Sequence, residues 1–221
     1  MAPLLTAGPF SARDGEGRVL FTDVTVELNE GELVVLDGPS GSGKSTLLRQ
    51  LVGMLPTEDA RRELGGEPYA SGPQLPRWRS MVTLIAQDAP MLAGSLGDNV
   101  RFPFTQRCSG KASPDESRFG ELMRATGLAG LPEDRDVSTL SGGERHRLAL
   151  VRGLLWDPPV LVADEPLSGL DGERAAAAFD LLLEFAHRSG HGVLCVLHDR
   201  SLATRADRIL PLATRTSEVG A

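Results

Sequence analysis

Residues 38–45 have the residue types and the spacing of a loop that binds phosphate groups. The run lies between an apolar stretch and a helical pattern, and it consists of Gly38, Pro39, Ser40, Gly41, Ser42, Gly43, Lys44 and Ser45. Its glycines allow backbone N–H groups to converge on an anion at a helix N-terminus. Lys44 would neutralise phosphate charge, Ser45 would ligate Mg²⁺, and Ser40 and Thr46 would make secondary contacts. The pattern of this phosphate loop predicts a site for a nucleoside triphosphate.

Two carboxylates, Asp164 and Glu165, follow the apolar run of residues 160–163. An aspartate at the end of a buried strand, opposite a phosphate loop, can hold Mg²⁺ directly or through water. Glu165 would then polarise a water for in-line attack on the terminal phosphate. The alternative is a helix cap or a turn before Pro166. The phosphate loop favours the catalytic interpretation.

Ser141, Gly142, Gly143 and Glu144 form a turn, the Ser141 turn, that has both a structural and a functional interpretation. Ser-x-x-Glu is a capping box, which stabilises any helix by about 0.5–2 kcal/mol. A cap does not require two glycines in the first helical turn, where they weaken the helix. These glycines are explained if bare backbone N–H groups must approach an anion closely.

Single polar residues follow two further apolar runs. Gln87 follows residues 82–86, and His198 follows residues 193–197. A lone glutamine or histidine is usually structural. Ligands of open parallel α/β sheets, however, bind outside the carboxyl ends of the strands. The phosphate loop, Gln87, the two carboxylates and His198 would therefore meet at one edge of one sheet.

The elements that must position these groups can be read from the apolar pattern. Residues 33–36 form a continuous apolar run, typical of a strand covered on both faces, and apolar and polar residues alternate over 24–28. Apolar residues recur at helical spacing from Leu47 until Pro56, and again from Phe119 to a stop at Gly127. A further helix is predicted over residues 141–156.

Composition narrows the class of protein. The hydrophobic fraction of 41% and the charged fraction of 24% are typical of a soluble globular chain. No apolar run is long enough to span a bilayer, and no signal peptide is expected. A net charge of −7 argues against a nucleic-acid partner. Cys108 and Cys195 match no metal or redox spacing, so reduced thiols are expected.

The chain resembles the ATP-binding-cassette (ABC) ATPases from about Val19 to Leu212. The resemblance lies in the order of three motifs: the phosphate loop, then the Ser141 turn preceded by Leu140, then the pair Asp164 and Glu165. The resemblance implies an α/β fold: a P-loop NTPase core with a mostly parallel sheet flanked by helices, N-terminal antiparallel strands and an inserted helical subdomain. We expect one ABC ATPase domain over 1–221, with the α/β core in 1–87 and 158–221 and the subdomain in 88–157.

The resemblance also implies roles for single residues. The Ser141 turn would press on the γ-phosphate of ATP bound to the opposite subunit. Gln87 resembles the residue that senses Mg²⁺ and the attacking water, so it joins Ser45 and Asp164 as a candidate metal contact. His198 resembles the histidine that contacts the γ-phosphate. Asp171 belongs to a loop, residues 168–171, through which two subunits meet near the active sites.

Two parts of the resemblance are less specific. The family usually places an aromatic residue for adenine stacking before the first strand pair, and Phe10 is the candidate; its alternative is a disordered or core-packed N-terminal residue. Residues 94–104 are similar to a segment of small exporter ATPase subunits of the FetA/YbbL type. Many exporter cassettes carry a similar run there, so the segment names no substrate.

The resemblance implies ATP and Mg²⁺ as cofactors, a second ABC ATPase subunit as partner, with a homodimer expected, and a separately encoded membrane permease. The chain would lie in the cytoplasm, peripheral on the inner face of the cell membrane. ATP-driven dimer closure would drive transport. The alternatives are a soluble ABC ATPase that remodels a protein assembly or nucleic acid, and a nucleotide-binding module without turnover. Cargo and direction of transport stay open at this point, because cargo selectivity would reside in the permease.

Overall fold

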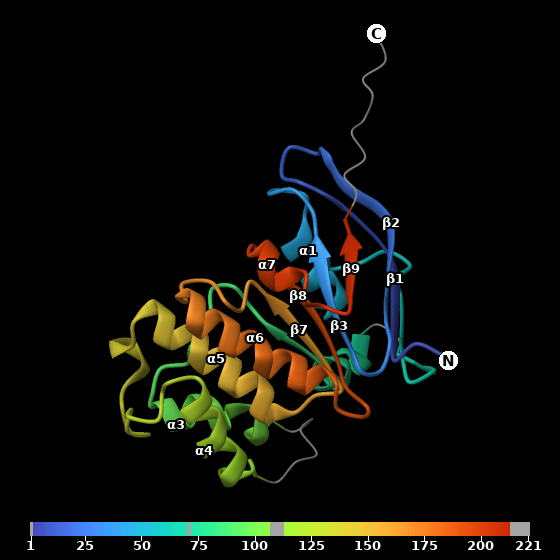
Figure 1. Ribbon diagram of the computed structural model, residues 1–221. Coiled ribbons are helices and arrows are strands. Elements are labelled where there is room, and N and C mark those ends of the chain that lie inside the picture. The colour runs from blue at the N-terminus through green and yellow to red at the C-terminus, as the bar shows by residue number, and fades with distance from the viewer. Residues whose placement is uncertain (1, 70–71, 107–112, 213–221) are drawn as a thin grey trace.

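The computed structural model describes residues 2–69, 72–106 and 113–212, and its strands form two sheets (Figure 1). Cys108 lies outside the described residues. The larger sheet has the strand order β6-β7-β8-β3-β9, and the smaller one has the order β2-β1-β4-β5. The chain is therefore an α/β protein with an additional sheet, as the sequence predicted.

All neighbouring strands of the larger sheet are parallel. The strands are β3 (Glu32–Asp37), β6 (Val82–Ile85), β7 (Val160–Asp164), β8 (Gly192–Val196) and β9 (Arg208–Pro211). The carboxyl ends of parallel strands lie at one edge of a sheet, so the residues after β3, β6, β7 and β8 come together there.

The smaller sheet is antiparallel and is built mainly from the N-terminal part of the chain. It contains β1 (Leu5–Arg13), β2 (Val19–Leu28), β4 (Arg61–Leu64) and β5 (Glu67–Pro68). Strand β1 pairs with β2 on one side and with β4 on the other. The predicted N-terminal antiparallel strands are thus confirmed.

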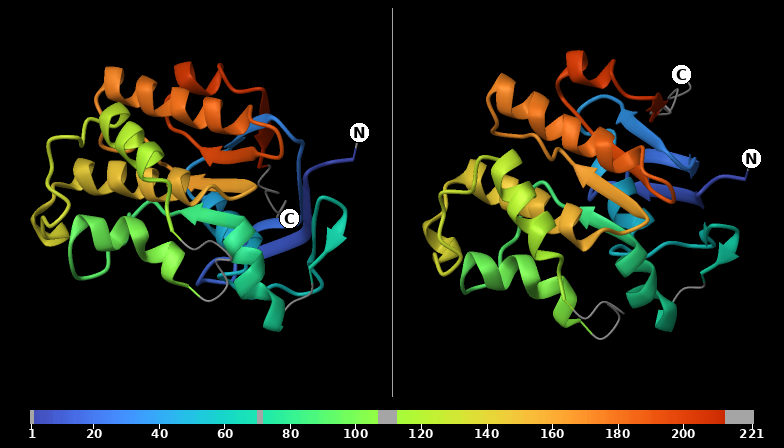
Figure 2. Two further views of the ribbon diagram at one scale, coloured as in Figure 1. Left: turned by 90° about the horizontal axis from the view of Figure 1, so that it is seen from below. Right: turned by 60° about the horizontal axis from the view of Figure 1, so that its bottom comes forward.

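The helices lie around the larger sheet (Figure 2). The α-helices are α1 (Lys44–Leu51), α2 (Leu75–Met81), α3 (Leu96–Arg101), α4 (Glu116–Ala125), α5 (Gly142–Trp156), α6 (Gly172–Ala186) and α7 (Arg200–Ala203). Three short 3₁₀ helices accompany them: η1 (Gly72–Gln74), η2 (Phe102–Thr105) and η3 (Val137–Thr139). All described helical elements of the segment 88–157, from α3 to α5, lie together in Figure 1, away from the antiparallel sheet.

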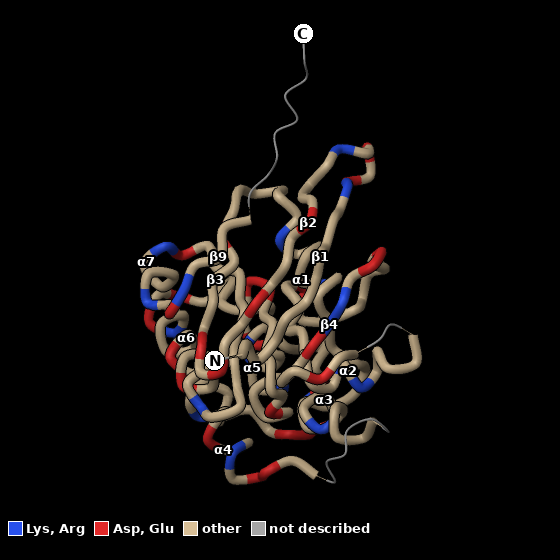
Figure 3. The backbone as a smooth tube through the Cα atoms, turned by 90° about the vertical axis from the view of Figure 1, so that its right-hand side faces the viewer, with Lys and Arg blue, Asp and Glu red and all other residues tan. Residues whose placement is uncertain are grey.

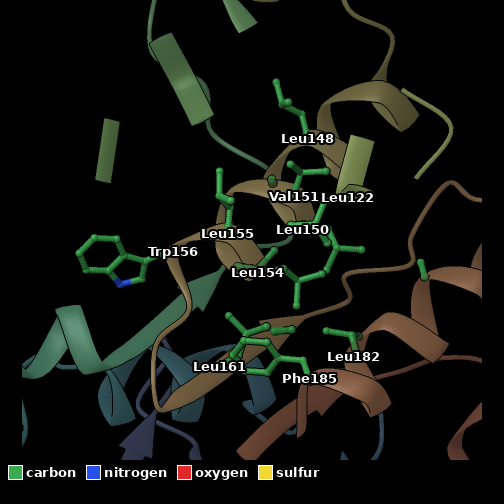
Figure 4. Packing of buried hydrophobic residues seen from close by; sticks show 14 of the residues in the cluster. Leu122, Leu148, Leu150, Val151, Leu154, Leu155, Trp156, Leu161, Leu182 and Phe185 are labelled. Carbon is green, nitrogen blue, oxygen red and sulfur yellow. The ribbon is translucent and has the colours of Figure 1, made fainter. Parts of the chain in front are cut away.

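Two hydrophobic clusters cover the two faces of the parallel sheet. Successive side chains of a strand point to opposite faces, so Leu33 and Val35 of β3 join one cluster, while Val34 and Leu36 join the other. The first cluster also contains apolar residues of α3 to α7, and Figure 4 shows those of α4, α5 and α6 packed with Leu161 of β7. The second contains residues of α1, α2 and the antiparallel sheet. Burial on both faces explains why this strand has an unbroken apolar sequence.

Helix α1 is shorter than the apolar pattern predicted, because it ends at Leu51 and does not continue to Pro56. The Gln50 carbonyl accepts a hydrogen bond from the buried Arg62 side chain, and the Leu51 carbonyl accepts one from Trp78 Nε1 at 2.9 Å. Gly53 then adopts a positive φ of 73°. Side chains from distant segments thus occupy carbonyls that another helical turn would require.

Candidate functional site

The phosphate loop connects the end of β3 to the start of α1. Gly41 and Gly43 have φ values of 77° and 93°, a backbone region that favours glycine. A Cβ atom at Gly43 would lie 2.9 Å from the Phe21 ring, so side chains are also excluded there by space. Gly43 is the N-cap of α1 and provides no side-chain cap to the helix. The first N–H groups of α1 therefore remain suited to an anion.

The Lys44 side chain folds back onto the backbone of the phosphate loop. Its Nζ atom donates hydrogen bonds to the carbonyl oxygens of Gly38 at 2.7 Å and Pro39 at 3.0 Å. The ammonium group is thus held over the loop by neutral acceptors. Phosphate oxygens carry more negative charge than these carbonyls and would compete for the same donors. The arrangement fits a triphosphate site.

Asp164, at the end of β7, provides the strongest test of the predicted Mg²⁺ site. Its side chain is buried beside the Ser45 hydroxyl, and its Oδ1 atom has no hydrogen-bond partner within the described part of the chain. Burial raises the pKa of Asp164, the Ser45 hydroxyl opposes this shift, and the negative charge of Glu165 adds to it. A buried carboxylate oxygen without a partner, beside a serine hydroxyl, fits the oxygen ligands that Mg²⁺ requires.

We expect Asp164→Asn to raise the thermal stability of the nucleotide-free protein. The raised pKa means that the carboxylate charge destabilises the fold, and this cost grows as the pH rises through the native pKa. Removing the charge should raise Tm by about 2–4 °C at pH 8, the shift that corresponds to about 1 kcal/mol in a domain of this size. At pH 4 the difference should shrink. Calorimetry at both pH values checks this, and an equal or lower Tm of the variant at pH 8 would contradict it.

Glu165 is held between the ends of two other strands. Gln87 Nε2, after β6, donates to Glu165 Oε2 at 2.8 Å, and His198 Nε2, after β8, lies 2.6 Å from Glu165 Oε1. Glu165 adopts a positive φ of 51°, which is uncommon for a residue with a side chain. A pocket of about 240 Å³ lies beside Glu165 and His198. The structure therefore brings the three candidate catalytic residues into direct contact.

The Ser141 turn caps α5 and leaves its first residues exposed. Both hydrogen bonds of the capping box are present: Glu144 Oε2 accepts from Ser141 N–H at 2.8 Å, and Ser141 Oγ accepts from Glu144 N–H at 3.2 Å. The bond from Ser141 N–H holds the pKa of Glu144 below its usual value. Ser141 and Gly142 are exposed, and a Cβ at Gly142 would meet no atom of the described ranges within 4 Å. The turn is thus available to another molecule.

Asp171 caps α6 close to this turn. Its side chain accepts from Arg174 N–H at 3.0 Å and pairs with Arg174 Nη1 at 3.0 Å. Two residues earlier, Gly169 packs against the start of α5: a Cβ atom at Gly143 would lie 3.5 Å from the carbonyl oxygen of Gly169. The loop of residues 168–171 and the Ser141 turn therefore form one continuous surface.

Phe10 does not expose a ring face in this structure. Its side chain is 1% exposed and belongs to the core cluster that also contains Phe21 and Val34. The Arg62 guanidinium lies 5.8 Å from the centre of its ring. Strand β1 lies between β2 and β4, and this position buries Phe10. Of the two interpretations of Phe10, core packing is the one that this geometry supports.

One contact at the site had no sequence signal that we recognised. His146 Nε2 of α5 lies 2.7 Å from the carbonyl oxygen of Gln87. The two residues are 59 positions apart, and the acceptor is a backbone atom. Helical spacing places His146 one turn after Gly142, but it does not show which strand end that face of the helix meets.

The fold and the site define a P-loop nucleotide-binding protein. Its sequence matches the family model described as ABC transporter over residues 21–168. It is 40% identical over 195 residues to a "Lipoprotein-releasing system ATP-binding protein LolD" of Anaeromyxobacter dehalogenans, and the match covers 86% of this chain and 80% of that protein. The chain therefore belongs to the ABC transporter family, as its motifs predicted.

Other relatives share the same region. An "Fe(3+) ions import ATP-binding protein FbpC" of Streptomyces coelicolor is 37% identical over 196 residues, which are 88% of this chain and 55% of that protein. The chain thus spans little more than half the length of this relative. The solved structure of a bacterial Atm1-family ABC exporter with ATP bound superimposes with a TM-score of 0.80 at 24% identity, covering 96% of this chain and 37% of the other. This likeness confirms the fold.

None of the helices within the described ranges has the length and apolar character needed to cross a membrane.

Proposed function

We propose that this chain is the ATP-hydrolysing subunit of an ABC transporter and that it couples ATP-driven dimer closure to transport by a separate membrane permease. The observation that supports hydrolysis best is the position of Glu165. Its two carboxylate oxygens contact Gln87 and His198, and the buried Asp164, the last residue of β7, directly precedes it. A carboxylate fixed in this way can orient a water and accept its proton.

The other residues of the site would bind and stabilise the phosphates. Lys44 and the N–H groups at the start of α1 would bind the phosphate chain and stabilise the negative charge that develops during phosphoryl transfer. When bound, Mg²⁺ would neutralise phosphate oxygens, with Ser45, Asp164 and Gln87 as its contacts from the protein. His198 would hold the γ-phosphate next to Glu165. Release of that phosphate would remove the contacts that favour closure.

The exposed Ser141 turn supports a head-to-tail dimer. Bare N–H groups at the start of α5 favour an anion, as they do at α1. Figure 1 shows α5 among the helices on the side away from the antiparallel sheet, whereas α1 lies close to that sheet. In the proposed dimer, the Ser141 turn of one subunit would contact ATP in the phosphate loop of the other. Asp171 would lie in the same interface. A homodimer is the simplest form.

A surface groove next to β6 supports docking of a permease. The groove has a volume of about 330 Å³ and lies between α2, β6, η2 and α5, with Pro76, Thr83, Phe102, Pro103 and Ala149 among its lining residues. Phe102 is 41% exposed and lines this groove together with other apolar side chains, so the groove offers an apolar contact surface. The groove adjoins the strand that leads to Gln87. The chain would then be held at the inner face of the cell membrane by its permease.

Phe102→Asp should abolish this docking and leave nucleotide binding intact, because a carboxylate placed in an apolar contact must lose its hydration. We expect the tagged wild type, but not the variant, to retain a polytopic protein when purified from solubilised native membranes. Ile209→Asp is the matched control: Ile209 is 48% exposed on β9, at the opposite edge of the sheet from β6. Equal recovery of the membrane protein with both variants would contradict docking at this groove.

Release of phosphate from ATP by the purified chain, measured with and without Mg²⁺, tests the enzymatic part of the proposal. The chain should hydrolyse ATP only with Mg²⁺, and its rate per molecule should increase with protein concentration as dimers form. The negative charge of −7, with basic residues scattered among acidic ones (Figure 3), does not favour a nucleic-acid substrate. A chain that binds ATP without any turnover would contradict the proposal and support a binding module.

A further inference from the structure

Helix α5 is fastened to the β6 strand and its flanking segments by three hydrogen bonds from side chains to backbone carbonyls. His146 Nε2 lies 2.7 Å from Gln87 O, Arg152 Nη2 donates to Pro90 O at 3.1 Å, and Trp156 Nε1 donates to Ser80 O at 2.8 Å. Only the first of these reaches a residue that contacts Glu165. His146 is thus the point at which α5 and the catalytic carboxylate are connected most directly.

The direction of the His146 hydrogen bond is fixed by its partner. A backbone carbonyl can only accept, so Nε2 must carry the proton and donate it. The other ring nitrogen, Nδ1, is buried and has no hydrogen-bond partner within residues 2–69, 72–106 and 113–212. The ring is therefore fixed by one directional contact and by packing, since a Cβ at Gly169 would lie 3.8 Å from Nδ1.

His146 lies between the two segments that surround the catalytic carboxylate. One is Gln87, whose side chain donates to Glu165. The other contains Gly169, in the loop that follows Glu165 and joins it through the hydrogen bond from Ser168 N–H to Glu165 O at 3.1 Å. A displacement of α5 would therefore move the groups that hold Glu165. A displacement of the groups around Glu165 would likewise move α5, because the coupling free energy between two linked sites is reciprocal.

We infer that His146 is a positioning residue that couples the two ATP sites of the dimer. The inference rests on the proposed function, in which the Ser141 turn of each subunit serves the ATP of its partner. His146 lies on the same helix as that turn and holds Gln87 of its own subunit. Closure of the turn on the partner's nucleotide would thereby set the position of Gln87 and Glu165 in the subunit that provides the turn.

His146→Ala should lower kcat by about fivefold or more, which corresponds to about 1 kcal/mol of lost transition-state stabilisation. It should also lower the Hill coefficient for ATP from above 1 in the wild type to 1. The affinity of the monomeric chain for a fluorescent ATP analogue, measured at protein concentrations too low for dimers to form, should not change, because His146 is not part of the phosphate loop. His146→Gln keeps an N–H donor of similar reach and should restore both kcat and the Hill coefficient.

Three comparisons separate coupling from a merely structural role. Arg152→Met removes the neighbouring α5 hydrogen bond to Pro90 and should lower Tm without changing the Hill coefficient. His187→Ala removes a histidine that pairs with Asp207 and should leave all kinetic constants unchanged. In a Gln87→Ala background, His146→Ala should have little further effect on kcat, because both changes interrupt the same connection.

The outcomes also separate this inference from the proposed function. Absence of Mg²⁺-dependent turnover in the wild type would overturn the proposed function and the inference together. With turnover present, three results would overturn the inference alone. The first is a wild-type Hill coefficient of 1, and the second is a His146→Ala variant with the kcat and Hill coefficient of the wild type. The third is a His146→Gln variant that does not recover the kcat and Hill coefficient of the wild type.

Discussion

Glu165→Gln should reduce ATP turnover by about two to four orders of magnitude, the contribution typical of a positioned general base. The amide has nearly the same shape as the carboxylate, so it can remain between Gln87 and His198. It cannot accept a proton from water at neutral pH. Phosphate release measured with saturating ATP and Mg²⁺ gives the size of the effect.

The same variant should accumulate as an ATP-dependent dimer. If ATP holds two subunits together and hydrolysis releases them, blocking hydrolysis leaves the closed state populated. Light scattering with and without ATP and Mg²⁺ would show a doubling of mass in the variant and a smaller change in the wild type. Glu133→Gln is the matched control, because Glu133 pairs with Arg101 away from the site. A variant that stayed monomeric or kept wild-type turnover would contradict the role of Glu165.

Lys44→Ala should weaken ATP binding by about a hundredfold. Nζ is the charged donor of the phosphate loop and makes two hydrogen bonds there. Hydrogen bonds that involve a charged group contribute about 1.5–3 kcal/mol each, and about 1.4 kcal/mol corresponds to a factor of ten in affinity. Lys44→Arg should not restore binding, because a planar guanidinium has a different shape and donor geometry from a compact ammonium. Titration with a fluorescent ATP analogue measures the affinity of both variants.

The control for this experiment is Arg188→Ala. Arg188 pairs with Asp157, which precedes β7 and so lies at the end of the sheet opposite to the phosphate loop. This variant removes one positive charge from the chain, as Lys44→Ala does, and should bind the analogue like the wild type. Equal weakening by both changes would indicate a general effect of charge and would contradict a specific role of Lys44.

The helix that follows the phosphate loop illustrates the limit of local pattern. Apolar residues continue at helical spacing to Leu55, but α1 ends at Leu51. Arg62 and Trp78 hydrogen-bond to the last carbonyls of α1, and Met54 and Leu55 are exposed. The periodicity of a single segment contains no information about side chains that arrive from 11 or 27 residues away.

By itself, the sequence determined β3, β6, β7 and β8 of the parallel sheet, though not β9, and it also determined the phosphate loop and the polar groups at the strand ends. These features depend on neighbours in the chain: an apolar run fixes a buried strand, and glycines at set positions fix a loop. Because parallel strands end at one edge, the convergence of Gln87, Asp164, Glu165 and His198 was also predictable.

Only the tertiary structure decided which groups touch and which are buried. It pairs β1 with both β2 and β4, and this buries Phe10. Among the residues that the structure describes, it leaves one oxygen of Asp164 without a hydrogen-bond partner, and it places His146 against the Gln87 carbonyl. Such contacts depend on the rotation of a helix about its axis and on the order of strands in a sheet. Both are set by packing between segments distant in sequence, because apolar surface is buried and close-packed only when these segments come together.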